Sequence, residues 1–378
     1  MKKFQSALLI HHRLHGKLII SSKIPVKGKK ILSLIYTPGV AEAVIEIAKN
    51  KDSIYDLTIK NNTIAVVTDG SAVLGLGNVG PEAALPVMEG KCAIFAEFAD
   101  INAFPICLKT QNVDEIIQTI KNISPVFGGI NLEDIAAPAC FEIEERLQKE
   151  LDIPVMHDDQ HATAIVVLAG LINSAKVVNK DLKKCKVVIT GAGAAGNAIA
   201  KLLNFYGVEN IILVDSKGII GSLRKDLDDY KKKLLPITNK DNLSGDLKTA
   251  TNLGDILIGV SQKGIFTREI IKSLNHKAIV FALANPDPEV TFSDAKKWGV
   301  SVYACGRSDY PNQINNALVF PGFFRGLLKG KITKITNHMK VNAAQSLASL
   351  IKNPTPNNFI PSIFDNRLVP CIVKSLLK

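Results

Sequence analysis

Acidic side chains gather in two short segments of this chain. Glu133 and Asp134 are neighbours in VFGGINLED, and Asp158 and Asp159 follow the apolar run IPVM at the start of HDDQH. Neighbours on a helix do not face each other, so Glu133 and Asp134 reach one ion only from an irregular loop. Oxygen ligands without cysteine favour Mg²⁺ or Mn²⁺ over zinc. Taken alone, the acids of HDDQH also suit the N-cap of the following helix, so capping stays an alternative to metal binding.

A lysine lies where an apolar side chain is expected. PEAALPVMEGKCAIFAEFA, residues 81–99, predicts a helix that starts at a proline. Lys91 is three residues from Met88 and from Ile94, inside the apolar stripe. Its stem either follows the edge of the stripe to solvent, or the amine is desolvated. In the second case burial and a nearby cation lower its pKa, which would make Lys91 a base near neutral pH.

Two glycine loops have the spacing of a dinucleotide fingerprint. GAGAAG, residues 191–196, follows the β-branched run KVVIT, opens a helical segment, and is followed by a second strand, IILVD, that ends in an acid. GLGNVG, residues 75–80, has no strand running directly into it and no acid after the next strand. We therefore expect GAGAAG to bind the dinucleotide. The predicted nucleotide contacts are Gly191, Gly193, Ala194, Ala195, Gly196 and Asp215.

The acid of the second strand bears on the choice of cofactor. Asp215 would accept the ribose hydroxyls of the adenosine half and repel a 2′-phosphate, which favours NAD over NADP. Lys217, two residues later, weakens that preference, so NADP stays an alternative cofactor.

Composition excludes several classes of protein. The cysteines are scattered without a C-x-x-C pair, which argues against a zinc ribbon, a redox motif and a disulfide scaffold. The net charge of +11 is spread along the chain rather than gathered in one arm, which argues against nucleic-acid binding. No signal peptide or uninterrupted apolar span is found, so we expect a cytoplasmic protein with no membrane partner.

Long segments of the chain resemble the malic enzymes in their short prokaryotic form, without the phosphotransacetylase-like extension. The likeness runs from about residue 8 to IPSIFDNRLVP. It is carried by YTPGVAEA, VVTDGSAVLGLGNVGPEAALPVMEGK, INLEDI, HDDQHATA, GAGAAG, FALANPDPEV and GRSDYPNQINNALVFPG, in that order. Two departures are Cys92, where alanine is common, and the lack of a clear counterpart of the arginine that larger members place against a substrate carboxylate.

The resemblance implies roles for individual residues. It implies Tyr36 as general acid, Lys91 as general base, Glu133, Asp134 and Asp159 as metal ligands with Asp158 beside them, and Asn285 and Asn315 as substrate contacts, with Asn285 near the nicotinamide as well. The implied reaction is the oxidative decarboxylation of (S)-malate to pyruvate and CO₂ with NAD and Mg²⁺ or Mn²⁺. A malolactic reaction with bound NAD, a metal-independent dehydrogenase of similar architecture and a nucleotide sensor without activity are the alternatives.

The expected architecture is α/β with two domains. Residues 1–160 would form a small α/β domain that carries the substrate and metal groups. Residues 161–378 would form a doubly wound Rossmann-type NAD domain with a C-terminal helical tail, and the site would lie in the cleft between the domains. GLGNVG would let the backbone pass close to the substrate while it aims the helix that bears Lys91. The resemblance also implies a homodimer, with Tyr36 near the subunit boundary.

Overall fold

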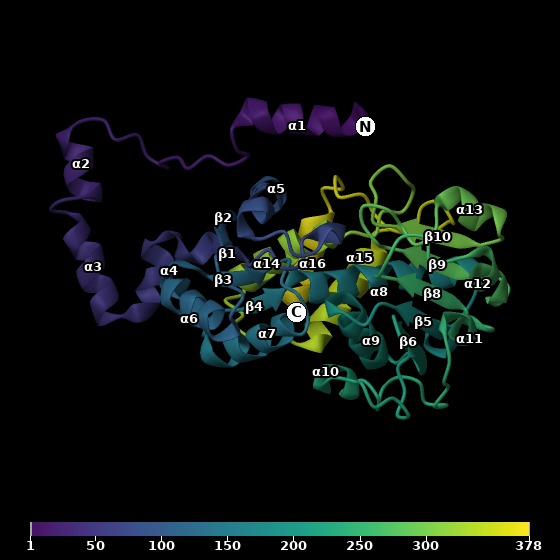
Figure 1. Ribbon diagram of the computed structural model, residues 1–378. Helices are drawn as coiled ribbons and strands as arrows, with labels where there is room; N and C mark the ends of the chain where they lie inside the picture. Colours follow the sequence, from purple (N-terminus) through teal and green to yellow (C-terminus); the bar gives the residue numbers. More distant parts are fainter. Residues whose placement is uncertain (1, 378) are drawn as a thin grey trace.

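The structure is a computed structural model that describes residues 2–377. The helices of an N-terminal arm lie apart from the body of the protein (Figure 1), which the arm contacts between α1 and α2, where Lys17 Nζ donates to the Pro86 carbonyl at 2.6 Å. Its helices are α1 (Lys2–Leu14), α2 (Lys29–Ile35) and α3 (Val40–Lys49). No residue of α2 or α3 is buried, although both helices are rich in apolar side chains. A folded chain rarely leaves such a surface in water, so the arm is a candidate contact surface.

The first sheet has four parallel strands in the order β2-β1-β3-β4. They are β1 (Thr63–Thr68), β2 (Asn102–Cys107), β3 (Gly129–Leu132) and β4 (Val155–His157). Successive side chains of a strand point to opposite faces. Helices cover both faces of this sheet, so β1 is buried along its whole length. Ile64 and Val66 pack on the side of α5 (Pro81–Ala99), whereas Ala65 and Val67 pack on the side of α6 (Val113–Ile123) and α7 (Ala139–Glu150).

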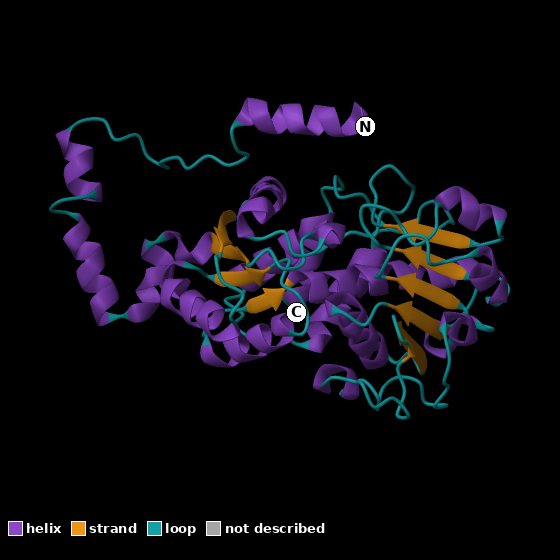
Figure 2. Ribbon diagram, viewed as in Figure 1, coloured by secondary structure: helices purple, strands orange, loops and turns teal. Residues whose placement is uncertain are grey.

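The second sheet has the order β10-β9-β8-β5-β6-β7, and only β7 is antiparallel (Figure 2). Its strands are β5 (Lys186–Thr190), β6 (Asn210–Asp215), β7 (Gly218–Ile219), β8 (Ile256–Gly259), β9 (Ile279–Ala282) and β10 (Val302–Cys305). The strand order reverses between β5 and β8, which is the switch point where doubly wound sheets bind ligands. The predicted strand KVVIT corresponds to β5, and the predicted Rossmann-type sheet is confirmed.

Helices cover both faces of the second sheet. One face carries α8 (Asp158–Val178), α9 (Ala194–Tyr206) and, outside them, α15 (Asn337–Ser349). The other carries α11 (Leu247–Thr251), α12 (Arg268–Ser273) and α13 (Phe292–Lys297). The remaining helices are α4 (Ile54–Leu57), α10 (Asp229–Lys232), α14 (Phe320–Lys329) and α16 (Leu368–Leu376), with short 3₁₀ helices at Lys51–Ser53, Ile59–Asn62, Leu74–Leu76, Ser124–Val126, Leu182–Lys184 and Asn316–Leu318.

One hydrophobic core joins the two sheets. Ile64 of β1 and Val187 of β5 belong to the same cluster of buried residues, which α8 crosses from end to end. Helix α14 packs on α5, so the C-terminal tail returns to the first sheet. The boundary drawn at residue 160 falls within α8, which carries metal-site acids at its start and core residues of the second sheet further along. The division into residues 1–160 and 161–378 stays a prediction.

Two segments of the described chain are long and apolar enough to cross a membrane. One is helix α8, most of which is buried inside the protein, as expected of a core helix. The other is residues 29–49 of the arm, which are not buried. All the cysteines are free.

Candidate active site

A cavity of about 770 Å³ opens between the two sheets. Lys91, Asp134, Asp159, Asn285 and Asn315 line it. Strands β3 and β4 are parallel neighbours, so the acids that follow them meet at the carboxyl edge of the first sheet. Asn285 follows β9 and comes from the carboxyl edge of the second sheet. The cavity therefore brings residues of both sheets together, as the sequence predicts.

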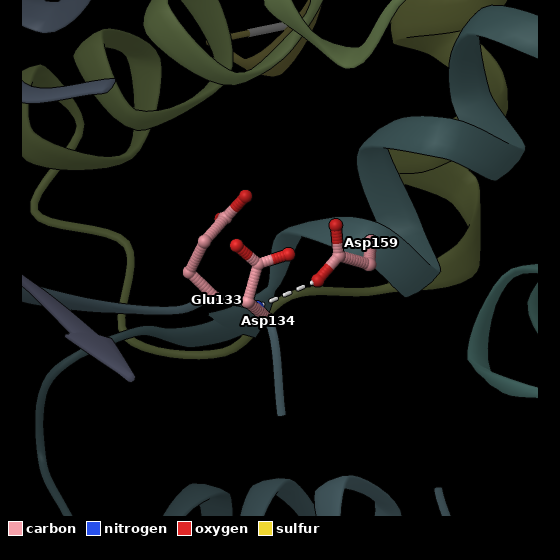
Figure 3. A group of neighbouring side chains, drawn as sticks. All are labelled: Glu133, Asp134 and Asp159. Carbon is pink, nitrogen blue, oxygen red and sulfur yellow. Dashed lines mark hydrogen bonds between the residues drawn. The ribbon is translucent and has the colours of Figure 1, made fainter. Parts of the chain in front are cut away.

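Three carboxylates converge in this cavity (Figure 3). Glu133, Asp134 and Asp159 each offer an oxygen, and these atoms all lie within 4.8 Å of one another. The Asp134 amide donates to Asp159 Oδ2 at 2.9 Å. Asp134 has a φ of 50°, a left-handed conformation that aspartate tolerates better than most residues. This irregular backbone is what allows the neighbours Glu133 and Asp134 to face one ion.

The charge of the cavity favours a bound cation. Lys91 is the only cationic side chain among the described residues that line it, against Glu133, Asp134 and Asp159. Burial raises the pKa of Glu133 well above its usual value, an effect that nearby Lys91 opposes and the neighbouring acids reinforce. A divalent ion with oxygen ligands would balance this excess of negative charge. The three carboxylates thus fit Mg²⁺ or Mn²⁺.

Lys91 is buried, with only 7% of its surface exposed. Its Nζ forms ion pairs with Glu133 Oε1 and, at 2.5 Å, with Asp158 Oδ2, and it lies 4.5 Å from the centre of the Phe320 ring. The amine does not follow the edge of the helix to solvent. The expected lowering of its pKa is wrong for the protein without a metal. Burial alone would lower the pKa, but Asp158 and Glu133 outweigh it and raise the pKa.

Asparagines complete the wall of the cavity. Asn285 and Asn315, the predicted substrate contacts, both line it, and Asn315 Oδ1 also accepts from the Ala317 amide at 2.9 Å. Asn316 also lines it, and its Nδ2 donates to Asp158 Oδ2, the oxygen that Lys91 contacts. Sequence reasoning missed Asn316, for which the only signal was its place next to Asn315. No arginine is found among the described lining residues, so a clamp for the substrate carboxylate stays unassigned.

The first glycine loop packs against the asparagine loop. A Cβ atom added at Gly75 would collide with the carbonyl oxygen of Asn285. Gly75 also lines the cavity, and the loop leads directly into α5, which carries Lys91. GLGNVG is therefore a close-approach loop of the cavity wall and lines no part of the nucleotide cavity described next.

A second cavity, of about 900 Å³, contains the dinucleotide fingerprint. Gly191 and Gly193 line it, and so does Asp215, at the end of β6. Gly191 has a φ of +100°, and a Cβ atom there would lie 2.5 Å from the Val260 carbonyl oxygen, so only glycine fits. Gly193, Ala194 and Ala195 also line the first cavity, which places the loop between the two spaces. Gly196 begins the buried side of α9.

Cations surround Asp215. Arg224 Nη1 donates to Asp215 Oδ1 at 2.6 Å, and Lys231 Nζ donates to Oδ2 at 3.0 Å. Burial alone would raise the pKa of Asp215, but these bonds and the Lys217 amide lower it, so the carboxylate stays ionised. The side chain of Lys217 instead pairs with Asp226 at 2.9 Å. Neither Arg224 nor Lys231 was anticipated from the sequence, because their contacts with Asp215 depend on how the irregular segment after β7 and the short helix α10 fold back on the end of β6.

Tyr36 lies outside this site. It follows α2 on the arm and is 67% exposed, and it is not among the residues that line either cavity. Its role as general acid stays a prediction, because Tyr36 does not reach the active-site cavity within one chain.

Comparison with known proteins identifies the relationship. Residues 15–148 match the family "Malic enzyme, N-terminal domain", and residues 161–374 match "Malic enzyme, NAD binding domain". The chain belongs to the malic enzyme family. This malic enzyme is 50% identical over 377 residues to the bifunctional malic/malolactic enzyme of Bacillus subtilis (strain 168), covering 99% of this chain and 92% of the relative. It is 52% identical to the NAD-dependent malic enzyme of Geobacillus stearothermophilus, covering 96% and 76%.

A solved structure agrees with the fold. The NAD-dependent malic enzyme of Thermotoga maritima matches this malic enzyme with a TM-score of 0.95 and 45% identity, covering 98% of both chains. The family resemblance and the two-part α/β architecture predicted from the sequence are both confirmed.

Proposed function

We propose that this malic enzyme oxidises (S)-malate with NAD and releases pyruvate and CO₂. The observation that carries the proposal is one cavity that contains buried Lys91, three converging carboxylates and the end of the dinucleotide loop. The relatives named NAD-dependent malic enzymes support the same reaction. Hydride transfer and decarboxylation must occur on one bound substrate, so these groups are needed side by side.

The first step needs an acceptor for the hydroxyl proton of malate. As the C2 hydrogen leaves as hydride to the nicotinamide ring, Lys91 Nζ takes that proton. Glu133, Asp134 and Asp159 would hold a divalent ion, which would supply positive charge to offset the carboxylates around Lys91 and to polarise the C2 oxygen. Asp158, held by Asn316, keeps the Lys91 amine aimed at the substrate.

The second step breaks the bond between C3 and the neighbouring carboxylate. The electron pair of this bond forms the enolate of pyruvate as CO₂ leaves. Asn285 and Asn315 offer amide groups that orient the substrate in the wall of the cavity. C3 then gains a proton, and the hydroxyl of Tyr36 is the proposed donor.

The position of Tyr36 leads to the oligomeric state. We propose a homodimer in which a second copy covers the arm and receives its Tyr36. The arm exposes a series of large apolar side chains: Leu8, Leu9, Leu14, Ile19, Ile20, Leu32, Leu34, Val44 and Ile45. Sedimentation velocity should give a dimer, and deletion of residues 1–49 should give a monomer. If the intact chain sediments as a monomer that binds lipid vesicles, the apolar segment 29–49 has a membrane as its partner instead.

NAD is the proposed main cofactor, and NADP a weaker alternative. Asp215 lies where it can accept the ribose hydroxyls, but Arg224 and Lys231 offset its charge. Repulsion of a 2′-phosphate should therefore be weak.

The test measures the absorbance of reduced nicotinamide with (S)-malate, Mn²⁺ and either NAD or NADP. We expect a rise that EDTA abolishes and that Lys91→Ala lowers by a factor of about 10³, since a positioned base contributes on the order of 10²–10⁴. Circular dichroism of Lys91→Ala checks that the variant folds. A rise that persists in EDTA would instead favour a metal-independent dehydrogenase.

A second candidate reaction is malolactic conversion. The Bacillus subtilis relative is named a bifunctional malic/malolactic enzyme, and it is 50% identical to this chain. This reaction keeps NAD bound and releases lactate. Equal amounts of pyruvate and NADH would exclude it as the main reaction, whereas lactate without free NADH would establish it. A nucleotide sensor without activity is disfavoured, because the cavity of one chain already contains the proposed base Lys91, three converging carboxylates and the asparagines Asn285 and Asn315.

A further inference from the structure

A buried chain of polar side chains joins three helices behind the candidate metal site. Lys340 of α15 donates from Nζ to His161 Nδ1 at 2.9 Å, and His161 Nε2 lies 2.9 Å from Glu144 Oε2. Glu144 is 5% exposed and Lys340 is 8% exposed. Because the Lys340 ammonium has no acceptor atom, His161 Nδ1 must accept, and Nε2 carries the proton that is donated to Glu144.

The glutamate at the end of this chain is ionised. Burial alone would raise the pKa of Glu144, but His161 and Lys340 lower it to about 2. A buried carboxylate remains charged only where several donors surround it. The donors to Glu144 come from the start of α8. Lys340 of α15 does not touch Glu144 and acts on it through His161.

Glu144 holds the first turn of α8 from outside. Its Oε1 accepts the His157 amide at 2.8 Å, and its Oε2 accepts Gln160 Nε2 at 3.1 Å. His157 is the N-cap of α8 but provides no side-chain cap. The Glu144 carboxylate therefore replaces a capping side chain of α8, and its negative charge interacts favourably with the positive end of the α8 dipole. Asp158 and Asp159 lie between the two tethered residues.

The chain and the active site occupy opposite faces of α8. Asp159 and Thr163 line the active-site cavity, whereas Gln160 and His161 line a separate cavity of about 350 Å³ together with Glu144 and Lys340. Residues on this second face do not contact malate or a metal directly, because α8 lies between them and the active-site cavity. Any effect they have on the reaction must come from where they hold Asp158 and Asp159.

We propose that Glu144, His161 and Lys340 are positioning residues. They hold Asp159 where it can bind the metal and Asp158 where it contacts Lys91. The proposal rests on the proposed function in that it takes Asp159 as a metal ligand. A carboxylate has to be held within a fraction of an ångström to bind a divalent ion well, and groups that support the ligands commonly set metal affinity.

The test compares Glu144→Gln with Glu145→Gln. Glu145 is the next residue of α7, lines the same 350 Å³ cavity and pairs with Lys233 at 3.8 Å. Glu145→Gln therefore removes the same charge as Glu144→Gln but leaves the hydrogen bonds to α8 in place. Mn²⁺ alone is titrated into each purified protein, and free Mn²⁺ is measured by electron paramagnetic resonance. We expect Glu144→Gln to weaken Mn²⁺ binding by about tenfold or more, as substitutions of supporting groups at metal sites do, and Glu145→Gln to match the wild type.

Further readouts separate positioning from simple stability. NAD affinity, measured by calorimetry, should stay within about twofold of wild type in Glu144→Gln, because that substitution leaves the nucleotide cavity intact. If Glu144→Gln does not fold, Lys340→Met takes its place, and a weaker Mn²⁺ affinity is again expected. Unchanged Mn²⁺ affinity in the folded variant would overturn the proposal. If wild type binds Mn²⁺ in a Glu144-dependent way but does not turn over malate, the proposed function fails and this inference stands.

Discussion

Single residues decide how strictly this malic enzyme selects its nucleotide. An acid at the end of β6 predicts NAD, since it would repel a 2′-phosphate. Asp215 has that place, but both of its oxygens accept from cations, Oδ1 from Arg224 and Oδ2 from Lys231. The described residues that line the nucleotide cavity include three aspartates and three cations. We therefore expect selectivity to depend on a balance of charges and not on one carboxylate.

This balance gives a prediction for Lys231→Ala. The substitution removes one cation from Asp215, so the carboxylate should repel a 2′-phosphate more strongly. We expect the KM for NADP to rise about tenfold, which corresponds to the free energy of one charge-assisted hydrogen bond. The KM for NAD should change less. Steady-state kinetics with both cofactors measures it.

A neighbouring lysine provides the control for this prediction. Lys232→Ala alters the next residue of α10, which pairs with Asp229 and does not line the cavity. It should leave both KM values unchanged. Equal effects of the two substitutions on NADP would contradict the charge-balance argument.

At the scale of elements, local patterns predicted the strands well and the contacts between them less well. The run KVVIT and the glycines after it gave β5 and the start of α9, because a buried parallel strand and its turn have a strong local signature. Lys91 was singled out because it interrupts an apolar stripe, and Glu133 and Asp159 because each belongs to a pair of neighbouring acids. All three line one cavity, and their roles stay predictions. Glu144 was missed, because nothing around it in α7 signals a bond to the His157 amide on a different element.

The first glycine loop is an element whose role depends on close approach. Gly75→Val would drive a side chain into the carbonyl of Asn285 and displace that residue from the cavity wall. We expect kcat/KM for malate to fall by at least about tenfold, because a misplacement of about 1 Å can cost on the order of a hundredfold. NAD affinity by calorimetry should change little, since Gly75 is not among the residues that line the nucleotide cavity.

A second glycine separates collision from backbone strain. Gly77 has a φ of +77°, and a Cβ atom added there meets nothing within 4 Å. Its ψ of −144° puts it in a region that is nearly restricted to glycine, so Gly77→Ala introduces only backbone strain, on the order of 1–3 kcal/mol, and Gly77→Val adds bulk to the same strain. Both should reduce malate turnover less than Gly75→Val. A loss of NAD affinity in any of the three would mean that this loop, too, contacts the nucleotide.

At the scale of the whole molecule, the active site of one chain lacks its proposed acid. Lys91 is buried in the cavity, whereas Tyr36 is exposed on an arm that extends away from the body (Figure 1). A homodimer that exchanges arms would cover the apolar surface and complete each site with the tyrosine of the other copy. Burial of that surface on association is favourable by roughly 25 cal/mol per Å², so the same contact would serve both stability and catalysis.

Hybrid dimers test this exchange directly. Tyr36→Phe and Lys91→Ala should each be nearly inactive as pure proteins. If Tyr36 acts across the dimer, a hybrid of the two variants has one site with both residues intact and one site that lacks both. Random mixing makes about half of the dimers hybrid, so about a quarter of the wild-type activity should return after the variants are unfolded and refolded together. If Tyr36 serves its own chain, every site in the hybrid lacks one of the two residues, and the mixture stays inactive.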